Sequence, residues 1–255
     1  MARTCVGVAG STAVGSIVSV GDSVKDLKAK DKVLVVSQGV WTDNVSVSAV
    51  DVMKIPDGLS LEESAALPAA LSAHAILHNF VPLTSGDVVV QSGGDSAVGK
   101  AIAQLGAAKG FKVVSATQAE MDDKDFPKKI AAMGKVKLAV SNTAKKSVSK
   151  SLMRCLAAEG SIVMYMGDGA TADDADGVDV PLGGAIFKKN SIFGFDFGAW
   201  YQSDREGVHA ALQGVCGDIG SKKLILKSKV FTQSDYLKAL KDVETTGGTS
   251  VVLKL

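Results

Sequence analysis

The sequence has few cysteines, few aromatic residues and no surplus of charge. Its three cysteines, Cys5, Cys155 and Cys216, are scattered and odd in number, which excludes a disulfide framework. The sequence has no CxxC pair or Cys/His cluster of the kind that binds zinc. The 28 basic and 27 acidic side chains leave a formal net charge of +1, so nothing in the composition indicates nucleic-acid binding. The sequence also lacks the run of about 18 apolar residues that a membrane-spanning helix needs.

The first ten residues, MARTCVGVAG, contain one arginine and no long apolar stretch. This pattern predicts neither a secretory signal nor a transit peptide, and fits an end left by processing or by truncation. The composition is 46% hydrophobic with 27 glycines among 255 residues. A glycine content above the average of roughly 7% favours an α/β protein whose layers pack backbone close to backbone.

The first quarter of the chain is predicted to be rich in short strands. Residues 13–56 contain β-branched segments separated by turns, with alternation of β-branched and polar residues around Val45–Val52. The turn Pro56-Asp57-Gly58 ends this region. Ser60 and Glu63 then have the spacing of a capping box, which predicts the start of a helix.

The middle of the chain changes to an alternation of strands and helices. A helix is predicted over Ala69–Phe80, followed by the fully apolar strand DVVVQS, the loop GGDSAVG and a small-residue helix that ends at Gly110. The next strand is Lys112–Ala116. Strand, glycine-rich turn, helix and strand in this order form a βαβ unit of the dinucleotide-binding kind.

The alternation continues to the end of the chain. Strands are predicted at 136–141 and 161–165, with a last core strand at SIFGF (191–195), and helical stripes run through 148–156 and 208–219. Residues 229–255 form a short strand–helix–strand return. We therefore predict an α/β fold with a doubly wound parallel sheet at 68–228, and a β-rich lobe made from residues 1–67 and the return at 229–255.

The glycine loop is the strongest candidate for a binding site. Glycines let a ligand approach the backbone, and the following helix offers unpaired N–H groups to a pyrophosphate. Present-day binding is a separate question, because Ser96 and Ala97 stand where glycine would allow a closer approach and Asp95 adds a carboxylate. The segment after the second strand, Thr117-Gln118-Ala119-Glu120, has no arginine for a 2′-phosphate. Glu120 fits either a ribose hydroxyl or an ordinary exposed charge.

Other candidate sites are weaker. His74 and His78 have the i, i+4 spacing of a two-histidine metal face, but without a third ligand they are interpreted as ordinary surface or pocket histidines. DDADG (173–177) lacks the ends of a calcium loop and is interpreted as a solvated acidic loop. No GxSxG motif indicates a serine hydrolase. Cys155 and Cys216 are predicted to be core thiols.

Several segments resemble one known family. AVGSIVSVGDSVKDLKAKDKV resembles its GxVxxVGxxVxxxxxGDxV pattern, GVW at 39–41 its Gly-x-Trp, and IPDGLSLEESAAL its helix entry. SGDVVVQSGGDSAVGKAIAQLGAAKG matches the strand, loop and helix, and FKKNSIFGFDFGAW a segment that ends in aromatic residues. The chain thus resembles the medium-chain dehydrogenase/reductase superfamily, and within it the mitochondrial 2-enoyl thioester reductases (trans-2-enoyl-CoA reductases).

The resemblance implies a Rossmann sheet, a GroES-like lobe that is truncated here, and a matrix-side mitochondrial location. It also implies hydride transfer from NADPH to the β-carbon of an enoyl thioester, without a metal. The residues that would contact NADPH are Ser72, Ser92, Gly93, Gly94, Ser96, Ala97, Val98, Gly99, Gln118, Tyr165 and Gly167. The substrate pocket would contain Trp41, Phe195 and Trp200, either as pocket walls or, for the tryptophans, as packing aromatics.

The chain departs from the family at positions that carry chemistry. Its first tyrosine is Tyr165, so the catalytic tyrosine of the family has no counterpart, and the arginines that recognise NADPH align with Gln118 and Glu120. We therefore expect an enoyl thioester reductase-like protein that is catalytically impaired and serves as a subunit of a mitochondrial complex or a homo-oligomer. Two alternatives stay open: an active NAD(P)H-dependent enoyl thioester or quinone-type reductase, and a nucleotide sensor without turnover.

Overall fold

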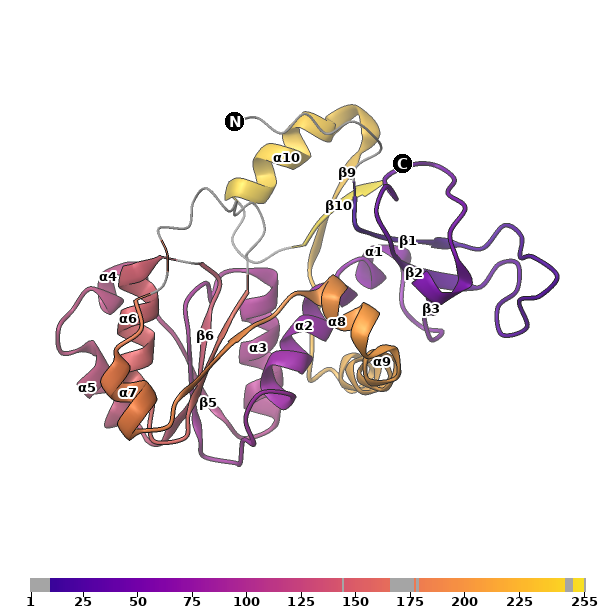
Figure 1. Ribbon diagram of the computed structural model, residues 1–255. Coiled ribbons are helices and arrows are strands. Elements are labelled where there is room, and N and C mark those ends of the chain that lie inside the picture. Colours follow the sequence, from indigo (N-terminus) through magenta and orange to yellow (C-terminus); the bar gives the residue numbers. More distant parts are fainter. Residues whose placement is uncertain (1–9, 144, 166–176, 178, 246–249, 255) are drawn as a thin grey trace.

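The computed structural model describes residues 10–143, 145–165, 177, 179–245 and 250–254. The chain forms a larger lobe around a parallel sheet and a smaller lobe of antiparallel strands, with the C-terminal segment lying against the smaller lobe (Figure 1). None of the helices in this described part of the chain is long and apolar enough to cross a membrane.

The larger lobe contains a five-stranded sheet in which all neighbouring strands are parallel. Its strands are β4 (Val88–Gln91), β5 (Lys112–Ser115), β6 (Val136–Ser141), β7 (Ser161–Met164) and β8 (Ser191–Gly194). The order is β5-β4-β6-β7-β8. Strand β5 thus lies on one side of β4 and strands β6 to β8 lie on the other, which makes the space between β4 and β6 the topological switch point. Ligands bind outside the carboxyl ends of the strands at such a switch point. The predicted doubly wound sheet is confirmed.

Helices cover both faces of this sheet (Figure 1). The long helices α2 (Leu67–His78), α3 (Ala97–Ala108) and α9 (Arg205–Gly220) lie on one side, and α4 (Gln118–Met121), α5 (Phe126–Ala131) and α6 (Lys146–Cys155) on the other. Along β4, Val89 packs into the first core and its neighbours Val88 and Val90 pack into the second. This alternation explains why the strand is apolar throughout, since both of its faces are buried.

Two further short helices, α7 (Leu182–Phe187) and α8 (Phe197–Ser203), were not expected from the sequence, and neither were α4 and α5. All four are seven residues or shorter, too short to show a helical period. Strand β8 was expected to be a core strand, and this prediction is wrong. All four of its residues are exposed, because β8 is the last strand in the order of the sheet and, among the described strands, pairs with β7 alone.

The smaller lobe is an antiparallel sheet of β1 (Thr12–Ser16), β2 (Lys32–Val36) and β3 (Val52–Lys54). The predicted strand around Val45–Val52 does not form; the short helix η1 (Ala49–Asp51) precedes β3 instead. Its alternating side chains are largely exposed, and alternation cannot make a strand without a neighbouring strand to pair with. Helix α1 (Leu61–Ser64) begins at the predicted Ser60–Glu63 capping box, which is confirmed.

The C-terminal segment contains β9 (Ser228–Thr232), η3 (Gln233–Asp235), α10 (Tyr236–Thr245) and β10 (Ser250–Lys254). β9 and β10 pair with each other in parallel and form a separate two-stranded sheet. This sheet lies against β1 and α1, where Val14, Val230 and Val252 line one cavity. Lys254 approaches Glu62 at 3.5 Å. Within the described residues, β1 and the strands β9 and β10 therefore meet through side chains rather than through a continuous sheet.

Tyr201 of α8 joins the two lobes. Its ring is 1% exposed, and its hydroxyl donates a hydrogen bond of 2.8 Å to the carbonyl oxygen of Val50 in the smaller lobe. Arg205, at the start of α9, lies 4.0 Å from Asp51 of the same segment. Leu34 and Met53 of the smaller lobe also belong to the core that contains α2 and α9. The lobes thus share one hydrophobic core in addition to this hydrogen bond.

We predict that Tyr201→Phe lowers the free energy of unfolding by about 1 kcal/mol, because it removes this hydrogen bond and keeps the ring in place. Urea unfolding followed by circular dichroism measures the change. Tyr236→Phe is the matched control, since the Tyr236 side chain is 44% exposed, and it should change stability by less than about 0.5 kcal/mol. Equal effects of the two substitutions would contradict the role given to Tyr201.

Candidate functional site

The loop between β4 and α3 presents free backbone donors. Ser96 is the N-cap of α3, and its hydroxyl oxygen accepts a hydrogen bond of 3.0 Å from the backbone N–H of Gly99. The backbone N–H groups of Ala97 and Val98 have no acceptor within the described residues. Unpaired N–H groups in the first turn of a 12-residue helix attract an anion such as a pyrophosphate. Asp95 is exposed beside them.

Three glycines let this loop pack tightly against its surroundings. A Cβ atom at Gly93 would collide with the Asn142 side chain, one at Gly94 with the Ser115 side chain, and one at Gly99 with the Gly93 carbonyl oxygen. Gly93 also has a φ of +64°, which favours glycine. The loop is therefore held against the carboxyl ends of both β5 and β6.

Two polar residues that no sequence motif indicated, Gln91 and Asn142, fix the loop to the carboxyl ends of the strands. Gln91 is fully buried, and its Nε2 donates hydrogen bonds of 2.9 Å to the Gly99 carbonyl oxygen and to Ser115 Oγ. Asn142 donates its backbone N–H to Ser92 Oγ at 3.2 Å, and Ser92 Oγ donates to Asn142 Oδ1 at 3.0 Å. A glutamine at the end of an apolar strand was the available signal for Gln91. Ser92 acts here by fixing the loop.

Tyr165 follows β7 and reaches across β6 to the loop. Its side chain is largely buried, and its hydroxyl oxygen lies 3.2 Å from Ser96 Oγ. The structure thus brings together two residues that were predicted to bind the cofactor. The hydrogen bond between them couples the end of β7 to the N-terminus of α3.

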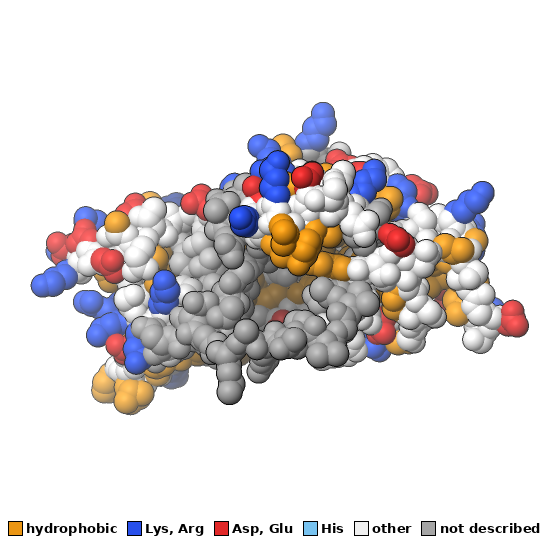
Figure 2. Space-filling view, turned by 90° about the horizontal axis from the view of Figure 1, so that it is seen from above, with side chains coloured by type: hydrophobic (Ala, Val, Ile, Leu, Met, Phe, Trp, Pro, Cys, Tyr) orange, Lys and Arg blue, Asp and Glu red, His pale blue; other side chains and the backbone are white. Residues whose placement is uncertain are grey.

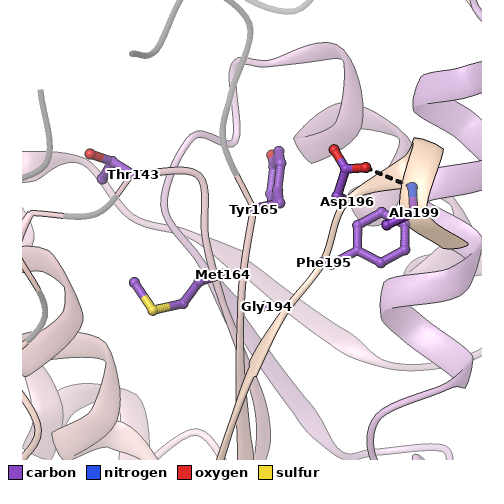
Figure 3. Close-up of a pocket in the computed structure, with 7 residues that line it drawn as sticks. All are labelled: Thr143, Met164, Tyr165, Gly194, Phe195, Asp196 and Ala199. Carbon is purple, nitrogen blue, oxygen red and sulfur yellow. Dashed lines mark hydrogen bonds between the residues drawn. The ribbon is translucent and has the colours of Figure 1, made fainter. Parts of the chain in front are cut away.

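A cavity of about 390 Å³ opens beside Tyr165 at the carboxyl ends of β6, β7 and β8. Figure 3 shows Thr143 and Met164 on one side of Tyr165, and Phe195 and Asp196 on the other. Asp196 accepts a hydrogen bond of 2.7 Å from the backbone N–H of Ala199, and so caps helix α8. The cavity lies at the carboxyl edge of the sheet, the edge at which doubly wound proteins bind ligands, and Tyr165 connects it to the glycine loop through Ser96.

Phe195, which lines the cavity, packs against two other aromatic rings. The rings of Phe195 and Trp200 lie 6.0 Å apart, and Phe80 lies 6.1 Å from Phe195. The indole N–H of Trp200 is buried and has no acceptor within the described residues. Two of the three residues predicted for the substrate pocket are therefore neighbours. Trp41 is not near them: it lines the second cavity, of about 430 Å³, between β1 and the C-terminal strands.

The remaining predicted cofactor residues differ in their surroundings. Ser72 is buried in α2, and its hydroxyl donates to the Pro68 carbonyl oxygen at 2.7 Å, so its proton is used within the helix. Gln118 is exposed on α4, where its Nε2 donates to Asp122 at 2.8 Å. Glu120 forms a capping box with Thr117 at the start of the same helix. Gly167 lies outside the described residues.

The paired histidines have no third metal ligand among the described residues. The rings of His74 and His78 are stacked at 4.2 Å, and the described residues contain no cluster of three or more metal ligands. Burial, helped by the positive charges of His78 and Lys109, lowers the pKa of His74 to about 4. Cys155 is buried, and burial raises the pKa of its thiol to about 12, as expected for a core thiol. Cys216 is partly buried, and burial also raises its pKa.

No family model matches the sequence. The mitochondrial enoyl-[acyl-carrier-protein] reductase of Dictyostelium discoideum is 26% identical over 98% of this chain and 78% of its own length. The protein of the same name from Caenorhabditis elegans is 29% identical over 91% of this chain and 73% of its length.

Solved structures show the same fold. A mutant form of enoyl thioester reductase from Candida tropicalis superposes with a TM-score of 0.82 at 21% identity, over 98% of this chain and 80% of the other. An Etr1p complex with NADP and crotonyl-CoA gives 0.80 at 20% identity over the same shares. An Etr1p/Etr2p heterodimer from Candida tropicalis gives 0.80 at 21% identity, over 96% of this chain and 80% of the other. The expected Rossmann sheet with a GroES-like lobe is thereby confirmed.

We predict that Gly99→Ala lowers the free energy of unfolding by about 1–3 kcal/mol, because the added Cβ meets the Gly93 carbonyl oxygen. Gly217→Ala is the matched control on α9: nothing lies within 4 Å of its Cβ position, and alanine in a helix should stabilise it by about 0.5–1 kcal/mol. Urea unfolding measures both. Effects of the same sign would contradict the close packing of the loop.

We predict that His74 makes the protein less stable in mild acid. Its pKa is about 4 in the folded chain and near 6.5 when unfolded, so the unfolded chain binds the additional proton. The free energy of unfolding should be unaffected by this group above pH 6.5 and should fall as the pH is lowered from 6.5 towards 4.

The test compares urea unfolding at pH 7 and pH 5. His74→Gln should reduce the loss of stability between these values, whereas His209→Gln, at an exposed position on α9, should leave the loss unchanged. An undiminished loss in His74→Gln would show that other groups cause it.

Proposed function

Starting from the relationship of this chain to the enoyl thioester reductases of the medium-chain dehydrogenase/reductase superfamily, we propose that it is a mitochondrial protein of reductase type with little or no turnover. Its glycine loop still binds a nicotinamide dinucleotide, and the protein serves as an accessory subunit of a larger assembly. Three observations support the proposal: the fold, the similarity to mitochondrial enoyl reductases, and the residues present at the glycine loop and the cavity.

The position of the tyrosine hydroxyls is the observation that carries the proposal. Reduction of an enoyl thioester needs a donor that stabilises the developing enolate oxygen and delivers a proton. The sequence has three tyrosines. Tyr165 is bonded to Ser96 at the glycine loop, and Tyr201 donates to the Val50 carbonyl oxygen. Tyr236 is exposed on α10 and does not line the cavity beside the loop. Tyr201 and Tyr236 therefore lie away from this cavity, and Tyr165, which lines it, shares its hydroxyl with Ser96 at the loop.

The residues of the loop fit a dinucleotide. A bound NAD(P)H supplies a hydride from its nicotinamide ring. The free N–H groups of Ala97 and Val98 would bind the pyrophosphate, and the three tightly packed glycines keep side chains away from it. The cavity lined by Met164, Tyr165 and Phe195 would take the nicotinamide end, because it lies on the far side of the switch point from β5.

Exposed apolar side chains support a role in an assembly. On α7, Leu182, Ile186 and Phe187 are 68%, 64% and 86% exposed. On α10, Leu237 is 68% exposed, and hydrophobic side chains also gather on the face shown in Figure 2. Apolar groups clustered on a surface in this way mark contacts with partners. The names of the relatives support the mitochondrial location.

The intact cavity favours a second candidate, an active NAD(P)H-dependent enoyl thioester or quinone-type reductase. In that case Ser72 and backbone groups would take the role that the tyrosine has in the family. The Ser72 proton already bonds Pro68, so the hydroxyl would have to rotate away from this bond in order to donate to a substrate. This requirement makes the second candidate the weaker one.

We predict that the purified chain reduces crotonyl thioester with NADH or NADPH at below about 0.01 s⁻¹, against an ordinary kcat of about 10 s⁻¹. Absorbance of the reduced nicotinamide measures the rate. Tyr236→Phe should leave any residual rate unchanged, because Tyr236 is exposed on α10 and does not line the cavity. Turnover within tenfold of ordinary reductases, or loss of that turnover in Tyr165→Phe, would establish the active reductase instead.

A further inference from the structure

The carboxyl end of β5 adjoins the glycine loop. Gln91 of β4 pairs with Ser115 of β5, and the backbone N–H of Ala116 donates to the Gln91 carbonyl oxygen at 2.8 Å. The Ser115 side chain fills the space beside Gly94. In doubly wound folds, the residues that follow this second strand meet the adenosine ribose of a bound dinucleotide. Residues 116–120 therefore stand where the 2′ position of that ribose would lie.

A carboxylate is held at this place. Glu120 Oε2 accepts hydrogen bonds of 2.7 Å from the Thr117 backbone N–H and of 2.8 Å from the Thr117 hydroxyl. These bonds lower the pKa of Glu120, so its side chain is ionised at neutral pH. The other oxygen, Oε1, accepts no hydrogen bond from the described residues and is available to a ribose hydroxyl. The capping box thus fixes a negative charge whose second oxygen can still act as an acceptor.

The segment that contains Glu120 is acidic. Residues 116–123 (ATQAEMDD) contain three acidic residues and neither lysine nor arginine. Lys124 follows this segment directly and is exposed, and Lys129 is paired with Asp123. The other lysines at the carboxyl edge, Lys145 and Lys146, follow β6, which lies on the opposite side of β4 from β5. A 2′-phosphate carries a charge of about −1.5 to −2 and would lie beside the ionised carboxylate of Glu120.

We propose that the loop selects a dinucleotide with an unphosphorylated ribose, NAD(H), over NADP(H), and that Glu120 is the residue that determines this specificity. The inference rests on the proposed function, because it concerns the same dinucleotide site at the glycine loop. It separates this chain from the Etr1p structure with bound NADP. Glu120 accepts a hydrogen bond from the 2′-hydroxyl and repels a 2′-phosphate.

Nicotinamide fluorescence titration of the full chain with NADH and with NADPH tests the proposal without relying on turnover. The wild-type chain should bind NADH at least about tenfold more tightly than NADPH. Glu120→Gln should reduce this ratio to below about threefold, because glutamine keeps the capping box and removes the charge. Glu120→Arg should reverse the preference, since a guanidinium pairs with a phosphate.

Glu206→Gln is the matched control, because it removes the same charge from an exposed site in the first turn of α9. It should preserve the wild-type ratio. Two results would overturn the proposed specificity: equally tight binding of NADPH and NADH to the wild type, or an unchanged ratio in Glu120→Gln. Both results would still support the dinucleotide site itself. Either result would also assign the 2′-phosphate to other groups such as Lys145. If neither dinucleotide binds, the dinucleotide site of the proposed function is refuted together with the specificity.

Discussion

The close approach of the glycine loop to three neighbouring strands is the constraint on which the rest of the site depends. Gln91 joins the first turn of α3 to β5, and Asn142 joins the loop to the end of β6. These contacts need backbone where other residues would place a side chain, which is why Gly93, Gly94 and Gly99 stand there. Because α3 and the ends of β4, β5 and β6 are fixed together, the free N–H groups of α3 point to one defined place.

In the same packing, the serine hydroxyl groups predicted to contact a ligand form hydrogen bonds within the protein. Ser92 bonds Asn142, Ser96 caps α3 and bonds Tyr165, and Ser72 bonds the backbone of its own helix. What is left for a ligand at the loop is mainly backbone N–H. Backbone groups bind an anion without providing a proton donor for catalysis. A site built in this way supports binding better than it supports proton transfer, and this difference underlies the proposed function.

The two halves of the site differ in their lining. The half beside β5 contains the fixed carboxylate of Glu120, whereas the half beside β7 and β8 is a cavity lined by Tyr165 and Phe195, in which Asp196 accepts a hydrogen bond from the backbone N–H of Ala199. A dinucleotide that spans the switch point would meet an acidic residue at its adenosine end and rings at its nicotinamide end. The fold provides the place for both halves, and particular side chains decide which nucleotide fits.

The sequence by itself determined the local structure and the fold class. The apolar β4, the glycine loop, the Ser60–Glu63 capping box and the end of α3 at Gly110 all depend on neighbouring residues, so their patterns could be recognised directly. Only the tertiary structure decided which distant residues meet. It paired Ser96 with Tyr165, separated Trp41 from Trp200, and placed β8 at an exposed edge. The physical reason is that these outcomes depend on strand order and on packing between segments far apart in the chain, and neither leaves a periodic signal in the sequence.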